Sequence, residues 1–278
     1  MLKKIKGTTP GKRHRLDIDR GSLHKGKPEK SLLAKGHKKR QGKDASGHIS
    51  MRHRGGGVKK KMRVVDFRRD KVGIPAIVKR IEYDPMRSAN VALLFYRDGE
   101  KRYIIAPEGL EIGAEIITEE KTDVKLGNCM QLKNIPIGMD IHNIELRQGK
   151  GAQIVRGAGL GAMIQSKEGK YAIIALPSKE QRLVSLDCFA TIGRVGNQEW
   201  KGVKLGKAGR KRMMGIRPTV RGTAQHPDSH PHGGGEGRSG VGMKHAKSPW
   251  GKNVAPGKRT RSIKKSTRHL VRDRRAKN

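Results

Sequence analysis

The chain has 278 residues, of which 63 are Lys or Arg and 25 are Asp or Glu, giving a formal net charge of +38. Hydrophobic residues make up 33%, which could fill two small cores but not a large enzyme-like core as well. So large a charge drives a compact state apart unless a polyanion neutralises it, and nucleic acid is the obvious polyanion. A membrane surface is the alternative, but no apolar run is long enough to span a bilayer and no amphipathic helix or lipid signal is visible.

The positive charge is concentrated at the two ends of the chain. Residues 1–60 carry 19 basic and 4 acidic side chains, net +15, and residues 201–278 carry 22 and 3, net +19. Residues 61–128 and 129–200 carry only +1 and +3. We therefore predict two core domains, 61–128 and 129–200, between a basic N-terminal extension (1–60) and a basic C-terminal extension (201–278). Such extensions bury too little apolar surface to offset backbone ordering, so we expect little regular structure in them without an anion.

The first core domain contains three predicted strands, 74–83, 90–96 and 101–106, which are rich in Ile, Val, Leu and Phe. Asp98-Gly99 lies between the last two and predicts a hairpin, because Gly accepts the positive φ of a type I′ turn. A boundary near Gly127-Asn128 precedes the second core domain.

The second core domain contains five predicted strands, with Pro177-Ser178 as a turn between the third and the fourth. The segment 156–165 allows a short helix at most. Many short strands at regular spacing predict small barrels, so the expected class is all-β with two consecutive barrels. Cys129 and Cys188 form no CxxC pair, and we expect both to be small buried residues in a reducing compartment. The five strands are 135–146, 153–156, 171–176, 182–185 and 190–195.

A glycine-rich basic run, Arg52–Gly57, ends the N-terminal extension and is followed by lysines. Three consecutive glycines let a backbone approach another surface closely and expose its N–H groups, while Arg presents a bidentate fork to phosphate. A flexible linker is the alternative. The net charge of the extension favours a loop laid against RNA.

A second glycine-rich stretch, Gly149–Gly159, superficially suggests a nucleotide-binding loop. It matches neither GxGxxG nor GxxxxGK[ST], whose spacings are needed to wrap a phosphate. Tight β turns near a basic groove are the favoured interpretation.

The C-terminal extension concentrates titratable side chains in residues 226–236, namely three histidines, an aspartate and a glutamate. A histidine here could act as a general base, and the cluster could bind a metal, although its spacing resembles no standard zinc pattern. We favour a third interpretation, a loop stiffened by Pro, thinned by Gly and threaded into RNA. The basic run 258–275 points the same way, because phosphate neutralisation releases counterions. Trp200 and Trp250 could stack on bases, and for Trp200 a small satellite core is equally open.

Six motifs stand out along the chain, namely Arg52–Gly57, Asp66–Arg69, Ile81–Pro85, Asp98–Ile104, Arg221-Gly222 and His230–Arg238. Together they resemble one family, the large-subunit ribosomal protein L2 family of bacterial type, from about residue 10 to the C-terminus. The resemblance implies an OB-fold barrel, then an SH3-like barrel, with both extensions threaded through large-subunit rRNA (23S in bacteria). It also implies a place near the peptidyl-transferase centre, small-subunit rRNA across the subunit interface, tRNA nearby, and roles in subunit association, tRNA binding and peptide-bond formation.

The sequence departs from the family pattern before the final motif. The family shows Asn-Pro-x-Asp-His, whereas here His226 stands for the Asn, Ser229 for the Asp, and Asp228 comes one place early. His230 matches the histidine for which direct catalysis has been suggested in the family. A carboxylate bonded to that imidazole is therefore not expected, which weakens a catalytic account more than a structural one.

We predict a structural, rRNA-organising ribosomal protein of the cytoplasm, with neighbouring ribosomal proteins as partners, and no enzyme activity, cofactor, metal, membrane or homo-oligomer contact. The alternative is an RNA-processing or acyl-transfer enzyme using His230, with Glu236. A free cold-shock-like RNA chaperone fits the first barrel but not the two long extensions. The predicted RNA-binding residues are Arg52, His53, Arg54, Gly55, Gly56, Gly57, Lys59, Lys60, Arg68, Arg69, Lys150, Arg156, Lys207, Arg210, Arg212, Arg217, Arg221, His230, His232, Gly233, Gly234, Arg238, Trp250, Lys258, Arg259, Arg261 and Arg274.

Overall fold

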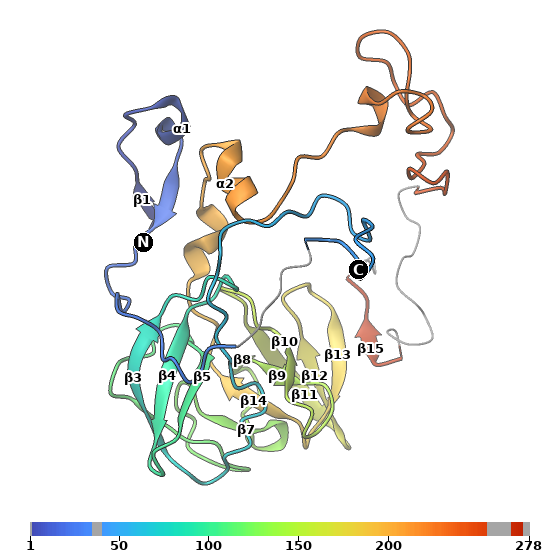
Figure 1. The fold of residues 1–278 in the computed structure, drawn as a ribbon. Coiled ribbons are helices and arrows are strands. Elements are labelled where there is room, and N and C mark those ends of the chain that lie inside the picture. Colours follow the sequence, from blue (N-terminus) through green and yellow to red (C-terminus); the bar gives the residue numbers. More distant parts are fainter. Residues whose placement is uncertain (1, 35–40, 255–267, 275–278) are drawn as a thin grey trace. The chain divides into compact units, whose positions relative to one another are not determined.

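A computed structural model describes residues 2–34, 41–254 and 268–274 (Figure 1). It divides the chain into two compact units. We call residues 1–38, 59–208 and 269–278 the barrel unit, and residues 39–58 and 209–268 the loop unit. Strands dominate the barrel unit, and the predicted all-β class is confirmed. No helix in the described ranges is long and apolar enough to cross a membrane.

The first curled sheet of the barrel unit has four antiparallel strands in the order β5-β4-β3-β6. All three strands predicted in this region are confirmed within one or two residues. A parallel bridge between Val65 and Tyr103 extends the sheet beyond β5. The strands are β3 (Ala76–Glu82), β4 (Val91–Tyr96), β5 (Lys101–Ile105) and β6 (Glu115–Ile116).

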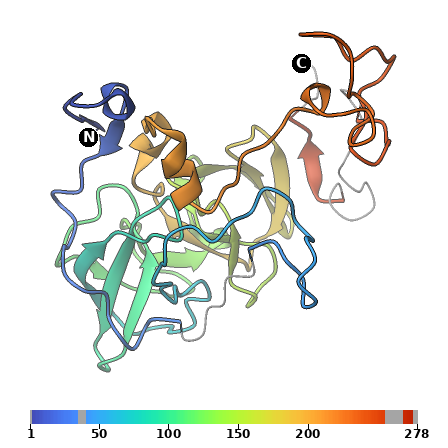
Figure 2. The ribbon, with the colours of Figure 1, turned by 45° about the horizontal axis from the view of Figure 1, so that its top comes forward.

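Both faces of β4 are buried, which explains its unbroken apolar run. Ala92 and Leu94 belong to the interior of the first sheet, whereas Val91 and Leu93 belong to a second cluster that also holds Val195, three residues after β14 of the other sheet. A strand covered on both sides does not alternate apolar and polar residues. The second cluster therefore joins the two sheets, which lie side by side in both views (Figure 1 and Figure 2).

The β4–β5 hairpin is confirmed, but its predicted type I′ turn is wrong. Of Asp98 and Gly99, Gly99 alone has a positive φ, +86°, whereas a type I′ turn needs two such residues. Tyr96 and Glu100 close the loop by a backbone N–H···O bond of 2.9 Å, leaving three residues between them. A three-residue loop, with glycine in the left-handed conformation, therefore connects β4 and β5.

The second curled sheet has seven strands in the order β15-β13-β12-β11-β8-β14-β7, and β9 and β10 form a separate ladder beside it. Its core contains Met130, Leu132, Ile141, Ile164 and Ile174, all of them fully buried. The elements are β7 (Cys129–Gln131), η1 (Leu132–Asn134), β8 (Asp140–His142), β9 (Ile144–Glu145), β10 (Ala152–Ile154), β11 (Ala162–Glu168), β12 (Tyr171–Ala175), β13 (Gln181–Ser185), β14 (Phe189–Ile192) and β15 (Leu270–Arg272).

Two expectations for this sheet are wrong. The segment 156–165, expected to allow at most a short helix, leads into β11, which pairs with β12 and β8. The run 135–146 is not one strand, because Gly138 and Asn143 adopt positive φ and break it into β8 and β9. The other predicted strands and the Pro177-Ser178 turn are present, the turn being closed by Leu176 N–H to Glu180 O at 2.8 Å.

Parts of both extensions belong to the barrel unit. At the N-terminus, β1 (Leu2–Lys4) and β2 (Leu16–Ile18) form a hairpin around α1 (Pro10–Arg13), and Leu16 bridges to Lys204 after η2 (Gln198–Gly202). Near the C-terminus, β15 pairs with β13. The remaining short elements are α2 (Ala208–Met213) and η3 (Gly222–Ala224).

Several buried side chains of the barrel unit have well-defined surroundings. Cys129 and Cys188 are free and buried, as expected. His142 bonds through Nδ1 to Gly193 O at 2.7 Å, and burial lowers its pKa to about 4, so a neutral imidazole is part of the sheet. Glu82, 2% exposed, accepts from Arg63 and Arg80 and from the Tyr103 hydroxyl.

Removing the Tyr103 hydroxyl should destabilise the barrel unit. This oxygen donates to Glu82 at 3.0 Å and accepts the Glu29 N–H at 3.0 Å, so Tyr103→Phe leaves a backbone donor without its acceptor. We expect a loss of about 1–3 kcal/mol of unfolding free energy, measured by denaturant titration. Tyr171→Phe, at an exposed ring on β12, is the control and should change little; equal losses would contradict this assignment.

Candidate nucleic-acid interface

The run Arg52–Gly57 lies in the loop unit, where it pairs with a segment of the C-terminal extension. Gly55 N–H donates to Gly215 O at 2.8 Å, and Val58 N–H donates to Met213 O at 2.9 Å. Arg217 N–H donates to His53 O at 3.0 Å. Segments about 160 positions apart in sequence are thus held together through backbone atoms.

Gly57 in this run and Gly215 in the facing segment are required by that pairing. Gly57 has φ +60°, and a Cβ there would lie 2.6 Å from Met213 O and 2.8 Å from Gly215 N. Gly215, at φ +88°, faces Gly55 O at 3.0 Å in the same way. Approaches this short between Cβ and backbone do not occur without displacement. The close backbone approach inferred from the three glycines is therefore made to the chain's own C-terminal extension.

A cationic pocket of about 610 Å³, which we call the arginine pocket, lies beside this pairing. Five of its lining residues are Lys or Arg, and none is Asp or Glu. Within the described residues, none of its four arginines forms an ion pair with a carboxylate. Such guanidinium groups are available for a bidentate interaction with phosphate. The charged lining residues are Lys43, Arg52, Arg54, Arg212 and Arg217.

A second pocket, of about 460 Å³, lies in the barrel unit and is called the Phe67 pocket here. Its lining includes Arg68, Lys101 and Lys150 around Phe67. The Phe67 ring also has the guanidinium of Arg156 4.6 Å from its centroid, at cation–π distance. Three predicted RNA-binding residues from distant segments, Arg68, Lys150 and Arg156, therefore meet around one aromatic ring.

The turn that carries Phe67 is fixed by hydrogen bonds. Asp66 accepts the backbone N–H groups of Arg68 and Arg69, each at 2.9 Å, and Phe67 O accepts Ala152 N–H at 2.7 Å. The turn sends neighbouring guanidinium groups in opposite directions. Arg68 is exposed, whereas Arg69 is 4% exposed and donates to Thr118 Oγ1 at 3.0 Å and to Gly127 O.

The histidine loop of the C-terminal extension is organised by imidazole acceptors. His230, 7% exposed, packs on Gly222, where a Cβ would lie 2.5 Å from the ring, and its Nδ1 accepts the His232 N–H at 3.0 Å. His232 in turn accepts the Lys247 N–H through Nε2 at 2.7 Å. Asp228 contacts the exposed His226, with its Oδ2 3.1 Å from Nδ1, rather than His230. No group of three potential metal ligands occurs in the parts of the chain that the structure describes.

The remaining predicted residues are distributed as follows. Trp200 is half-buried and packs on the cluster that joins the two sheets, whereas Trp250 is 76% exposed. Lys258, Arg259 and Arg261 lie outside the described residues. Sequence reasoning missed Phe67 itself and Lys43, although the aromatic ring between two charged residues of the Asp66–Arg69 motif was a usable signal. The other exposed or half-exposed members are Lys59, Lys60, Lys207, Arg210, Arg221, Gly233, Gly234, Arg238 and Arg274.

Two packed β sheets of low charge, together with cations gathered in two pockets and in exposed loops, define an RNA-binding β protein. Family comparison agrees with this class. The family described as "Ribosomal Proteins L2, RNA binding N-terminal domain" matches residues 29–118, and "Ribosomal Proteins L2, C-terminal domain" matches residues 125–251. The chain belongs to the ribosomal protein L2 family and is a structural, rRNA-binding component of the large ribosomal subunit.

Replacing Gly57 should disrupt the pairing within the loop unit. Gly57→Ala places a methyl group against Met213 O, so hydrogen exchange of the Val58 amide should accelerate and protease cleavage of the loop unit should increase. Gly47→Ala is a matched control, because Gly47 has φ +87° but no atom within 4 Å of its Cβ position. It should cost only the left-handed strain of about 1–2 kcal/mol. Equal protection of the Val58 amide from hydrogen exchange in the two variants would contradict the packing role of Gly57.

Proposed function

We propose that the arginine pocket binds backbone phosphates of large-subunit rRNA. The observation that carries the proposal is the presence of four arginines and a lysine around one pocket with no carboxylate in its lining. The barrels provide the contrast, because Arg63, Arg87 and Arg102 are engaged by carboxylates of the same fold. Cations that the protein leaves uncompensated gain most from neutralising phosphate and releasing its counterions.

The Phe67 pocket is proposed as a second rRNA-binding surface. Exposed Arg68 and Lys150 line it, and exposed Arg156 lies over the Phe67 ring, a combination that suits a sugar–phosphate chain with an adjacent base. Arg69 is excluded from the RNA-contacting set because its guanidinium is directed into the barrel. The N–H of Gly55 already donates to Gly215 O, so Gly55 contributes to this interface by its position and not by bonding to RNA.

Within the ribosome we propose the role that the family resemblance implies. The chain organises 23S rRNA near the peptidyl-transferase centre of cytoplasmic ribosomes and supports subunit association, tRNA binding and peptide-bond formation. Contact with small-subunit rRNA belongs to the same proposal. The two pockets lie in different units of the chain, which supports binding to more than one rRNA segment.

We assign His230 a structural role rather than a catalytic one. Its ring is packed on Gly222, and its Nδ1 is occupied by the His232 N–H, so this nitrogen is not free to take a substrate proton. The sequence departure at Ser229 agrees with this, because the nearby carboxylate of Asp228 contacts His226 instead. Glu236 is exposed on a glycine-rich stretch and supplies no second catalytic group at His230.

Neutralising two pocket arginines should lower RNA affinity and its salt dependence. For Arg212→Gln with Arg217→Gln, the slope of log K against log salt should fall by about 0.9 for each phosphate that is no longer neutralised, about 2 units in all. Filter binding of the full chain to 23S rRNA between about 50 and 200 mM salt measures this slope. Lys121→Gln with Lys170→Gln removes the same charge at exposed positions outside both pockets. An equal change in the control pair would show that net charge, not the pocket, is responsible.

Replacing His230 should impair assembly and not chemistry. His230→Ala removes a buried ring and the acceptor of the His232 N–H, so less of the variant should enter 50S-type particles in sucrose gradients. Single-turnover peptidyl transfer per fully assembled particle should be unchanged. His226→Ala, at an exposed ring, is the control for assembly. A decrease of about 100-fold or more in the chemical step on assembled particles would instead identify a general base.

A further inference from the structure

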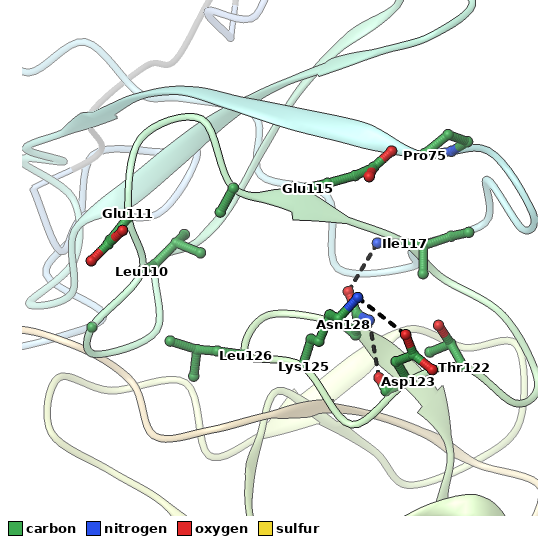
Figure 3. Close-up of a pocket in the computed structure, with 12 residues that line it drawn as sticks. Pro75, Leu110, Glu111, Glu115, Ile117, Thr122, Asp123, Lys125, Leu126 and Asn128 are labelled. Carbon is green, nitrogen blue, oxygen red and sulfur yellow. Dashed lines mark hydrogen bonds and ion pairs between the residues drawn. The ribbon is translucent and has the colours of Figure 1, made fainter.

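A third pocket, of about 630 Å³, lies in the barrel unit beside the short strand β6 (Figure 3). Its apolar lining residues are Pro75, Leu110, Ala114, Ile117 and Leu126. Three carboxylates and one lysine, Lys125, also line it, and we call it the carboxylate pocket. The carboxylates are Glu111, Glu115 and Asp123.

The walls of this pocket are held by a buried amide. Asn128, 2% exposed, accepts the Ile117 N–H through Oδ1 at 3.0 Å and donates from Nδ2 to Asp123 O at 3.0 Å. Its own backbone N–H donates to Lys125 O at 3.2 Å, so the side chain and the backbone both fasten the loop (Figure 3). A site fixed in this way needs little ordering when a ligand binds.

The charge around this pocket opposes that of the rest of the chain. Residues 107–128 contain six acidic and two basic side chains, net −4, in a protein of net charge +38. Glu111 and Glu115 form no ion pair within the described residues, whereas Asp123 pairs with Lys125 at 3.1 Å. Elsewhere in the first barrel, carboxylates such as Glu82 and Asp84 are paired with arginine. Uncompensated carboxylates repel phosphate, so this face is unsuited to RNA.

The surroundings of the pocket also expose aliphatic side chains. Ile112 is 62% exposed and Val124 is 45% exposed, one on each of the two segments that form the walls. A partner that fits must therefore carry positive charge and cover apolar surface. Lysine and arginine side chains combine both, because their methylene stems pack on apolar groups while their charged heads reach carboxylates.

We propose that the carboxylate pocket docks a lysine- or arginine-rich segment of a neighbouring protein. The cationic heads meet Glu111 and Glu115, and the aliphatic stems cover Leu110 and Leu126. The pocket residues lie outside both cationic pockets, so this interaction is independent of the proposed rRNA-binding surfaces. The protein would then carry two kinds of binding surface. The cationic pockets bind a polyanion, and the carboxylate pocket binds a polycation.

The test uses the full chain and a fluorescein-labelled peptide of alternating lysine and leucine as the probe. Anisotropy at about 0.15 M salt should show binding that weakens about tenfold or more in the double variant Glu111→Gln with Glu115→Gln. The matched control, Glu168→Gln with Asp187→Asn, makes the same change in net charge at exposed positions of the second barrel. It should weaken binding by about twofold at most. Because neither pair is buried or ion-paired in the described chain, unfolding midpoints should stay unchanged and confirm that both variants fold.

A photoreactive lysine analogue in the probe peptide identifies the site directly. Cross-links mapped by mass spectrometry should fall within residues 109–128 or at Pro75. Equal weakening in the two double variants, no binding to the unchanged chain, or cross-links elsewhere would each overturn the proposal. An oligouridylate that binds this chain with the same dependence on Glu111 and Glu115 would overturn it as well, because it would make the pocket a nucleic-acid site.

Discussion

The structure depends on a division between cations that are paired inside the fold and cations that are left uncompensated. In the first barrel, Arg102 contacts Asp66, Asp70 and Glu100, and the hydrogen bond from Arg102 lowers the pKa of Asp70. These pairs let a sheet with many charged residues stay nearly neutral and form around a small apolar core. Many carboxylates of the first barrel are used in such pairs, whereas no carboxylate lines the arginine pocket, so Arg52, Arg54, Arg212 and Arg217 suit a phosphate partner.

Repulsion between like charges sets a second constraint, which glycine and backbone bonding resolve. Arg52–Val58 and Met213–Arg217 both carry net positive charge, so no ion pair can join them. Backbone N–H···O bonds do not depend on net charge, and they form here because Gly57 and Gly215 allow the two segments to approach each other's carbonyl oxygens closely. The result places arginines from both segments around one pocket, which neither segment could build alone.

The barrels could be predicted from the chemistry of neighbouring residues, whereas the pairing of segments far apart in the sequence could not. The apolar run of β4 and the Asp98-Gly99 turn identified a hairpin, since both are properties of neighbouring residues. In β11, the alternation of buried Ala162 and Ile164 with exposed Met163 was present in the sequence, but three nearby glycines obscured it. The Arg69 side chain points inward because it bonds to Thr118 and Gly127, which the turn at Asp66 brings within reach. The sequence Arg68-Arg69 alone does not indicate which of the two side chains is buried. The pairing of Gly55 with Gly215 likewise has no local signature.

The histidine loop shows why a cationic RNA-binding segment benefits from imidazole. Its turns leave backbone N–H groups, at His232 and Lys247, that need acceptors. Lysine and arginine only donate, and a carboxylate would accept but would also repel phosphate. A neutral imidazole accepts through one nitrogen without adding negative charge, and its ring packs against glycine. His230 and His232 therefore order a loop in a basic extension by means that remain compatible with RNA.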